Sequence, residues 1–174
     1  MGYSALSTED TGNDNTAIGA QALKDFDYNG SGYNTAVGRR AGYVVSTGLR
    51  NTLIGALSAD ALTTGSDNVT LGYQALTTAN TDESKNVAIG TYALNVMDNG
   101  STTNTYNTAV GYYSGVAVTT GIQNTLIGGL AGDAITTGGN NIVIGYNAAA
   151  SAVDVDNEIT LGDSNISAFR CNDQ

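Results

Sequence analysis

The sequence predicts an all-β fold in which the chain winds as a β-solenoid, or β-roll, of about nine coils. Three observations support this prediction. A short motif such as NTLIG, at 51–55 and again at 124–128, recurs along the whole chain; its period is about 17; and each position of the motif holds one class of side chain. Such regularity excludes a disordered low-complexity chain, although Gly, Ser, Thr and Asn are abundant.

The glycine that ends each motif is the anchor from which positions are counted here, −1 for the residue before it and +1 for the residue after it. The anchors are Gly19, Gly38, Gly55, Gly72, Gly90, Gly111, Gly128, Gly145 and Gly162. Gly2 belongs to a truncated first copy, and most neighbouring anchors lie at the same separation, as Gly55 and Gly72 do. This period is short for a helical repeat and long for a heptad.

Each repeat offers a β-branched run, a glycine, a run of small residues and a polar cluster, which predicts strand, corner, strand and turn. Stacked coils give every backbone group a partner and every core side chain a layer above and below. At about 4.8 Å per coil, nine coils form a rod of roughly 43 Å.

Position −1 is always a branched aliphatic residue, and we expect it to form a continuous inward ladder, with small residues at position +3 facing it. Its members are Ile18, Val37, Ile54, Leu71, Ile89, Val110, Ile127, Ile144 and Leu161. By strand alternation, position −2 then points outward. The outward column comprises Ala17, Ala36, Leu53, Thr70, Ala88, Ala109, Leu126, Val143 and Thr160.

Position −4 is Asn in all coils except the last, where Glu158 replaces it. Asparagine bonds to backbone at turns, tolerates positive φ, and can bond to its stacked neighbours along an axis. The column is Asn15, Asn34, Asn51, Asn68, Asn86, Asn107, Asn124 and Asn141. These asparagines and the anchor glycines are predicted to be structural repeat residues.

Composition excludes several functions. The chain has 174 residues, no His and one Cys, Cys171, so His-dependent catalysis, His metal ligation and an internal disulfide are excluded. We expect no enzyme, no catalytic residue and no cofactor. The net charge of −10 argues against a nucleic-acid partner, and no apolar run is long enough for membrane insertion.

An apolar column on the outer face of a rod implies a partner of equal length. Identical chains related by a rotation axis are the simplest such partner, so we expect a parallel homotrimer. Open solenoid ends expose strand edges, which also favours end-to-end stacking of copies or contact with neighbouring fibre segments.

The repeat, as in NTAIGAQAL (15–23), NTAVGRRAG (34–42) and NVAIGTYAL (86–94), resembles the head repeats of trimeric autotransporter adhesins and, more closely, repeat arrays of phage tail fibres. The final NEITLGDSNISAFRCNDQ (157–174) is similar to the stretch that precedes a self-cleaving intramolecular chaperone domain in many tail fibres and tailspikes. Gln174 stands where that chaperone domain would begin, so it is either a processed end or a cut in a longer chain.

This resemblance implies a trimeric structural virion protein, a tail fibre shaft or head segment that works outside the cell in attachment to the host surface. It divides the chain into a solenoid array at 1–156 and a last coil with a C-terminal junction at 157–174. The implied partners are a host surface glycan or protein and other tail segments. A bacterial trimeric surface adhesin head, or another extracellular β-solenoid filament, is the alternative.

Tyrosines gather just after the anchors and are candidates for contact with a receptor or glycan, because their rings stack on sugars. They are Tyr73, Tyr92, Tyr112, Tyr113 and Tyr146, with Tyr3 in the same column. Stacked tyrosines also simply cover the flank of a rod, and this structural role is the favoured interpretation. Longer spacings predict looped-out insertions at 24–33, 79–85 and 95–106, which are further receptor candidates.

Acidic residues give weaker candidates. Asp154, Asp156 and Glu158 alternate, and Asp10, Asp14, Asp25 and Asp27 crowd turns, so a Ca²⁺ site or a glycosidase carboxylate pair is conceivable, but solvated turn acids are favoured. Arg39 and Arg40 are expected to form a solvated or interchain ion pair.

Threonines at position −3 motivate a remote alternative, an ice-binding solenoid. Thr16, Thr35, Thr52, Thr108 and Thr125 share this column, but Val69, Val87, Ile142 and Ile159 interrupt it, and strand alternation is expected to point it inward.

Overall fold

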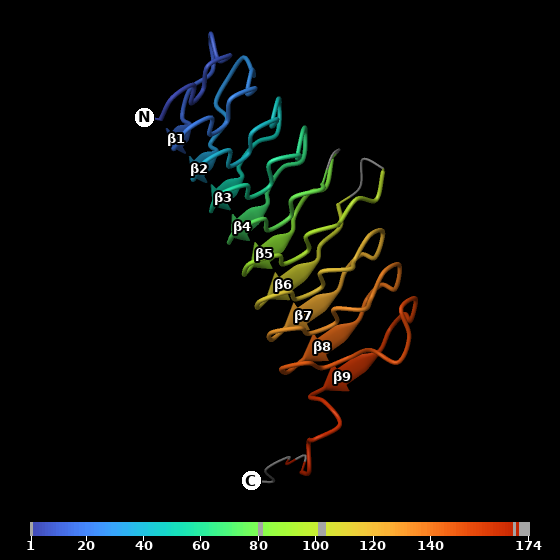
Figure 1. Cartoon of the computed structure of the whole chain (residues 1–174). Coiled ribbons are helices and arrows are strands. Elements are labelled where there is room, and N and C mark those ends of the chain that lie inside the picture. The colour runs from blue at the N-terminus through green and yellow to red at the C-terminus, as the bar shows by residue number, and fades with distance from the viewer. Residues whose placement is uncertain (1, 80–81, 101–103, 169, 171–174) are drawn as a thin grey trace, which may run out of the picture.

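The computed structural model describes residues 2–79, 82–100, 104–168 and 170, and over these the chain winds as a β-solenoid (Figure 1). Parts of two predicted insertions and most of the final residues, including Cys171, lie outside the described residues. The described part contains nine short strands. They are β1 (Thr16–Ile18), β2 (Thr35–Val37), β3 (Thr52–Ile54), β4 (Val69–Leu71), β5 (Val87–Ile89), β6 (Thr108–Val110), β7 (Thr125–Ile127), β8 (Ile142–Ile144) and β9 (Ile159–Leu161).

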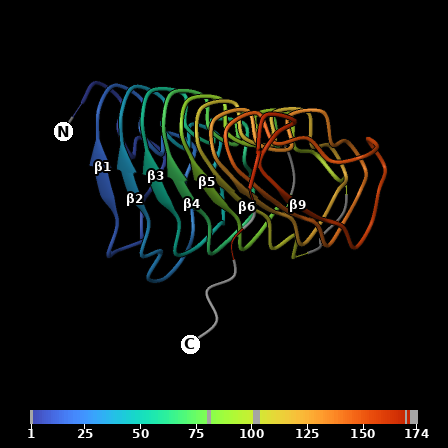
Figure 2. The ribbon, with the colours of Figure 1, turned by 90° about the horizontal axis from the view of Figure 1, so that it is seen from below.

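The nine strands form one parallel sheet in sequence order. Each coil sits in register with the next, so that Thr16 pairs with Thr35 at one end of the sheet and Ile144 pairs with Leu161 at the other. Figure 2 shows the coils following one another as a row of loops, with the strands side by side on one wall. This arrangement confirms the predicted solenoid and the period inferred from the sequence.

The orientation of the strands is opposite to the one that the sequence predicts. Position −2 is buried from β1 to β8 and partly buried in β9, so this column, predicted to face outward, lines the interior. Position −1, predicted to form the inward ladder, faces outward, as the 53% exposure of Ile18 and the 47% exposure of Leu71 show. Position −3, with the threonines, also faces outward instead of inward.

A narrow interior explains this reversal. Ser58 at position +3 and Thr70 at position −2 of the next coil meet inside the solenoid, with their hydroxyl oxygens 2.6 Å apart. The space between the two walls therefore suits the mostly small side chains of position −2, whereas a full ladder of Ile, Leu and Val would overfill it.

The second predicted strand of each coil does not form. The residues after the anchor run as turns in the described coils, because positions +2 and +4 adopt left-handed backbone conformations. Gln21 and Leu23, for example, have φ of 61° and 46°. Their backbone groups still bond to adjacent coils, as Leu23 N–H does to the carbonyl of Ala41 at 3.0 Å, so the stack is hydrogen-bonded without a second sheet.

The anchor glycines are required by two constraints. Gly55 has φ of 130°, a region that residues with a Cβ rarely adopt, and a Cβ there would lie 2.4 Å from the carbonyl oxygen of Gly72 in the next coil. The same close approach recurs between successive anchors along most of the column. Glycine therefore allows both the corner and the tight stacking of corners.

Four columns of apolar side chains make the core. Positions −2 and +3 face each other, and positions +4 and +7, which were not predicted to be core, complete it. The buried residues at +4 and +7 include Leu23, Leu76, Leu94, Phe26, Val45, Leu62, Met97, Val118 and Ile135. Apart from its two ends, the core is continuous along the axis.

The asparagine column is buried and clamps each coil to the next. Asn51 accepts a hydrogen bond from the backbone N–H of Asn68 at 3.0 Å through its side-chain oxygen, and donates one to the carbonyl of Gly65 at 2.9 Å. The axial bonding predicted from the sequence is thus confirmed, although most of it joins side chain to backbone. Positive φ falls on the residue before each Asn, such as Arg50, rather than on Asn itself.

The longer coils carry their additional residues away from the sheet, as the predicted insertions require (Figure 1). Isolated parallel bridges, Asn13 with Ser31 and Ser84 with Asn104, fasten the base of these segments to a neighbouring coil. Glu83 lies fully buried here at the position that a second glycine occupies in other coils, and its carboxylate accepts a hydrogen bond from the backbone N–H of Asn99. The strand register is therefore maintained past each insertion.

Candidate functional site

The outer wall of the sheet is a continuous apolar face, which we call the sheet face and define as positions −3 and −1 of all nine strands. No residue of this face is charged: five are Thr and the others are Val, Ile or Leu. Several are well exposed, including Ile127 and Ile144 at 38% and Ile159 at 68%. A face of this length and composition is typical of a surface that another molecule covers.

A polar rim borders the sheet face on the side where each strand begins. Arg50 binds Asp67 of the next coil through two hydrogen bonds of 2.6 and 2.9 Å, and these bonds hold the pKa of the Asp67 carboxyl below its usual range. Lys85, another coil along, donates a hydrogen bond to the hydroxyl of Tyr106 at 3.3 Å. An apolar centre with a polar rim is the usual anatomy of a protein interface.

The structure brings four of the predicted tyrosines together just past the glycine corners. The ring centroids of Tyr73 and Tyr92 are 5.6 Å apart, those of Tyr92 and Tyr113 are 4.9 Å apart, and those of Tyr112 and Tyr113 are 4.4 Å apart. Desolvation by this packing, with a smaller contribution from neighbouring phenols, raises the pKa of Tyr92 and of Tyr112. The phenols of Tyr92 and Tyr112 are therefore neutral at pH 7.

Tyr146 and Tyr3 do not join this cluster through any ring contact among the described residues. Tyr3 is 82% exposed at the N-terminal end. Tyr146 is 72% exposed. Its ring lies close to Gly129 one coil earlier, since a Cβ added to Gly129 would lie 3.5 Å from the Cδ2 atom of Tyr146.

The adjacent arginines differ in their surroundings. Arg40 lies 3.6 Å from the carboxylate of Asp60 and places its guanidinium 4.2 Å from the ring centroid of Tyr43, so its ion pair forms within one chain. Burial raises the pKa of Asp60 despite the nearby Arg40 charge. Arg39 is exposed. No sequence pattern signals the Arg40–Tyr43 pairing, because the two residues share a face only through the turns after the anchor.

Two of the acidic candidates near the C-terminal end accept hydrogen bonds from protein donors. Glu158 accepts hydrogen bonds from the backbone and hydroxyl of Ser151 and from the hydroxyl of Thr160, and these bonds lower its pKa. Asp156 accepts a bond of 2.7 Å from the backbone N–H of Gly139. Over the described residues, no group of three or more His, Cys, Asp or Glu side chains is placed to hold a metal ion.

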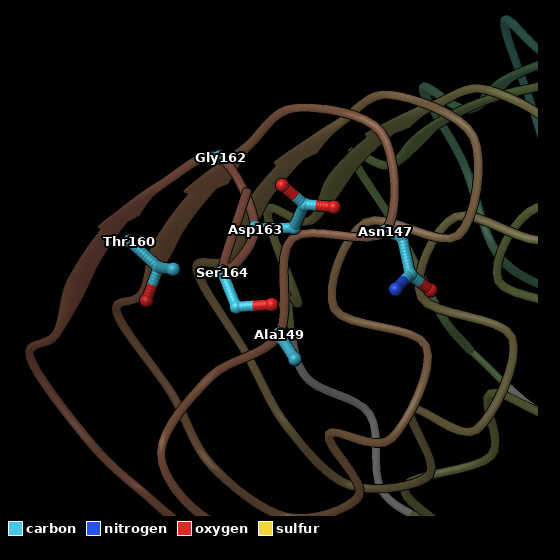
Figure 3. Close-up of a pocket in the computed structure, with 6 residues that line it drawn as sticks. All are labelled: Asn147, Ala149, Thr160, Gly162, Asp163 and Ser164. Atoms are coloured by element: carbon cyan, nitrogen blue, oxygen red, sulfur yellow. The ribbon is translucent and has the colours of Figure 1, made fainter. Parts of the chain in front are cut away.

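A hollow of about 430 Å³ lies at the C-terminal end of the solenoid (Figure 3), where β9 is the last strand of the described residues. Its lining residues are Asn147, Ala149, Thr160, Gly162, Asp163 and Ser164. Asp163 is the acid among them, and it accepts hydrogen bonds from the backbone and side chain of Asn165, which lower its pKa. The hollow is thus the exposed end of the core column, and its side chains do not form a nucleophile–base pair.

Comparisons with protein-family models, curated proteins and solved structures give no match to this chain. A search of the described residues for a helix long and apolar enough to cross a bilayer also finds none. The sheet face and the tyrosine cluster therefore stand as the two candidate functional surfaces on their geometry alone.

Proposed function

We propose that this protein is a non-catalytic fibre segment that assembles as a parallel homotrimer through its sheet face and serves in attachment to a host surface. The main support for this proposal is the uncharged apolar face that runs along all nine strands. Because this face is as long as the rod, an equally long partner covers it fully, and a parallel copy of the same chain meets that requirement.

The resemblance of the repeats to phage tail fibres and trimeric adhesin heads favours three copies over two, and a virion fibre over other settings. Attachment to a host surface follows from the same resemblance, with the tyrosine flank and the insertions as the exposed features that differ between coils. The same assembly also suits a bacterial adhesin head. A chaperone domain encoded directly downstream would favour the fibre, whereas a coiled-coil stalk and membrane anchor would favour the adhesin.

The oligomeric state tests the assembly directly. Light scattering is expected to give three times the mass of the 17.7 kDa chain. Ile127→Lys is expected to yield monomers, because it places a charge on β7, inside the face that the trimer would bury. Ile122→Lys is the matched control, since Ile122 is also 38% exposed but lies outside the strands. A monomeric wild-type protein would rule the assembly out.

The outward position of the threonine column supports a second candidate. Thr16, Thr35 and Thr52 lie in a row on the sheet face, where strand alternation was expected to hide them, and a flat array of Thr and aliphatic groups could order water. Ice binding would need this face to be uncovered, so it excludes the trimer. Thermal hysteresis together with a monomeric mass would favour ice binding over the fibre.

A further inference from the structure

The tyrosine cluster consists of a half-buried inner pair and a more exposed outer pair, and covering the solenoid does not by itself require the exposed pair. Tyr92 and Tyr113 are half-buried between their neighbours and cover the flank of the solenoid. Tyr73 and Tyr112 project further, with exposures of 44% and 58%. The outer pair therefore leaves aromatic surface open to solvent at both ends of the cluster, where a ligand can reach it.

The flank around the cluster is uncharged over five consecutive coils. Positions +1 and +2 from the corner after β4 to the corner after β8 hold only aromatic, amide, hydroxyl, Gly and Leu residues. They are Tyr73, Gln74, Thr91, Tyr92, Tyr112, Tyr113, Gly129, Leu130, Tyr146 and Asn147. In a chain with a net charge of −10, a flank of this kind favours a ligand that is itself neutral.

The chemistry of these groups fits a sugar. Aromatic rings offer apolar faces on which the C–H side of a pyranose can stack, and phenol and amide groups can bond to its hydroxyls. A cationic ligand fits less well, because the rings touch one another in tilted and edge-on pairs and so do not form a cage around a cation.

The spacing of the flank suits a polymer. Coils rise by about 4.8 Å, which is close to the length of one hexopyranose unit in an extended chain. Tyr146 lies two coils beyond Tyr112, with Gly129 between them, and the Tyr146 ring lies close enough to Gly129 that a Cβ there would be in van der Waals contact with it. From Tyr73 to Tyr146 the flank spans four coil rises, or roughly 19 Å.

We propose that this flank, the tyrosine track defined by Tyr73, Tyr92, Tyr112, Tyr113 and Tyr146, binds a linear neutral polysaccharide along the solenoid axis. Tyr112 and Tyr146 are the stacking platforms, and Gln74 and Asn147 supply amide groups for sugar hydroxyls. The inference deepens the proposed function by naming the class of surface ligand, and it rests on that function only for the biological setting. Binding itself requires the track, whatever the oligomeric state.

The test is titration of the purified protein with hexasaccharides of glucose, mannose and galactose, with hexagalacturonate as the anionic comparison. We expect at least one neutral hexasaccharide to bind, with Kd raised tenfold or more in Tyr112→Ala and in Tyr146→Ala. Tyr112→Phe should retain most of the affinity, because it keeps the ring. Tyr33→Ala is the matched control, since Tyr33 is 59% exposed but lies before β2, outside the track.

Several results would overturn the proposal: no binding of any neutral hexasaccharide, preference for hexagalacturonate, or equal affinity in wild type and both Ala variants. Loss of cell attachment in the Ala variants without saccharide binding would point to a protein receptor and would also overturn it. Light scattering on the same samples measures the oligomeric state independently of saccharide binding. The experiment therefore distinguishes failure of the trimer from failure of the saccharide site. Two independent Ala variants guard against misfolding of either one.

Discussion

At the scale of single residues, the asparagine column shows why one side chain recurs at one position. Each Asn accepts a bond from the backbone N–H at the same position of the next coil, and six of the eight also donate a bond to a carbonyl of that coil, as Asn124 does with Asn141 and Gly138. Asp has no donor for that carbonyl, and Ser is too short to reach both groups. The column ends at Glu158, whose backbone N–H donates the last of these bonds to the side-chain oxygen of Asn141. Its own carboxylate does not continue the column and instead accepts a bond from the backbone N–H of Ser151.

We predict that Asn51→Ala destabilises the fold by about 2 to 5 kcal/mol, because it leaves the buried N–H of Asn68 and the buried carbonyl of Gly65 each without a partner. Urea unfolding followed by circular dichroism measures this loss. Asn29→Ala, in an exposed turn, is the control and should change stability by less than about 0.5 kcal/mol. Equal effects of the two substitutions would show that the clamp contributes nothing.

The sequence alone was sufficient to predict the corner glycines and bonding of the stacked asparagines along the axis, because each needs a particular side chain. It did not predict that most of the asparagine bonds go to backbone groups of the next coil. It did not determine the face of the strand, since positions −1 and −2 are both largely apolar and a shift of one position exchanges inside and outside. Side-chain size was the available signal. Ala recurs at −2, whereas −1 is always Val, Ile or Leu, and a narrow interior accepts the smaller set.

At the scale of the coil, two core positions compensate for each other in volume. Where position +4 is Gly, as at Gly115, position −2 of the next coil is Leu126, and a Cβ on Gly115 would lie 2.6 Å from its Cδ1. Where position +4 is Leu, as at Leu94, the next −2 residue is Ala109. Each coil thus fills the space that its neighbour leaves, which keeps the core dense along the axis.

We predict strong coupling between Gly115→Leu and Leu126→Ala. The first substitution overpacks the core, and the second leaves a cavity that costs about 2 to 5 kcal/mol. Together they recreate the pairing of Leu94 with Ala109 in the adjacent coils. Leucine tolerates the left-handed backbone of position +4, because Leu94 occupies that position with φ of 49°. The double variant should therefore recover most of the stability lost in either single variant.

A double-mutant cycle by urea unfolding measures this coupling. Simple addition of the two losses would mean that the two positions do not share one space. Position +4 was not identified as core from the sequence because Gly, Leu and Ala alternate there without an obvious common property. Their relation appears only when each is paired with position −2 of the following coil.

At the scale of the molecule, the described residues form a one-dimensional stack in which each strand contacts only the strands next to it in sequence. The periodicity of the sequence was enough to predict this architecture, since a repeat that cannot bury its own apolar side must stack. It was not enough to place the tyrosine track. The contacts of Tyr73, Tyr92 and Tyr113 depend on the turns that follow each corner, and the sequence predicted a second strand there instead of turns.

Stacking of this kind predicts that one whole coil can be removed. Deletion of the segment 125–141, which is one full repeat, joins Asn124 to Ile142 and restores an Asn-Ile-Val-Ile-Gly motif, so we expect a folded β-solenoid with somewhat lower stability. Deletion of 125–142, longer by a single position, joins Asn124 to Val143 and moves Asn124 to position −3, which faces outward. That variant loses the clamp between two coils and should unfold at clearly lower urea concentration, measured by circular dichroism. If both deletions unfold alike, stability does not come from the register of successive coils, and the stack is held by interactions that the repeat does not encode.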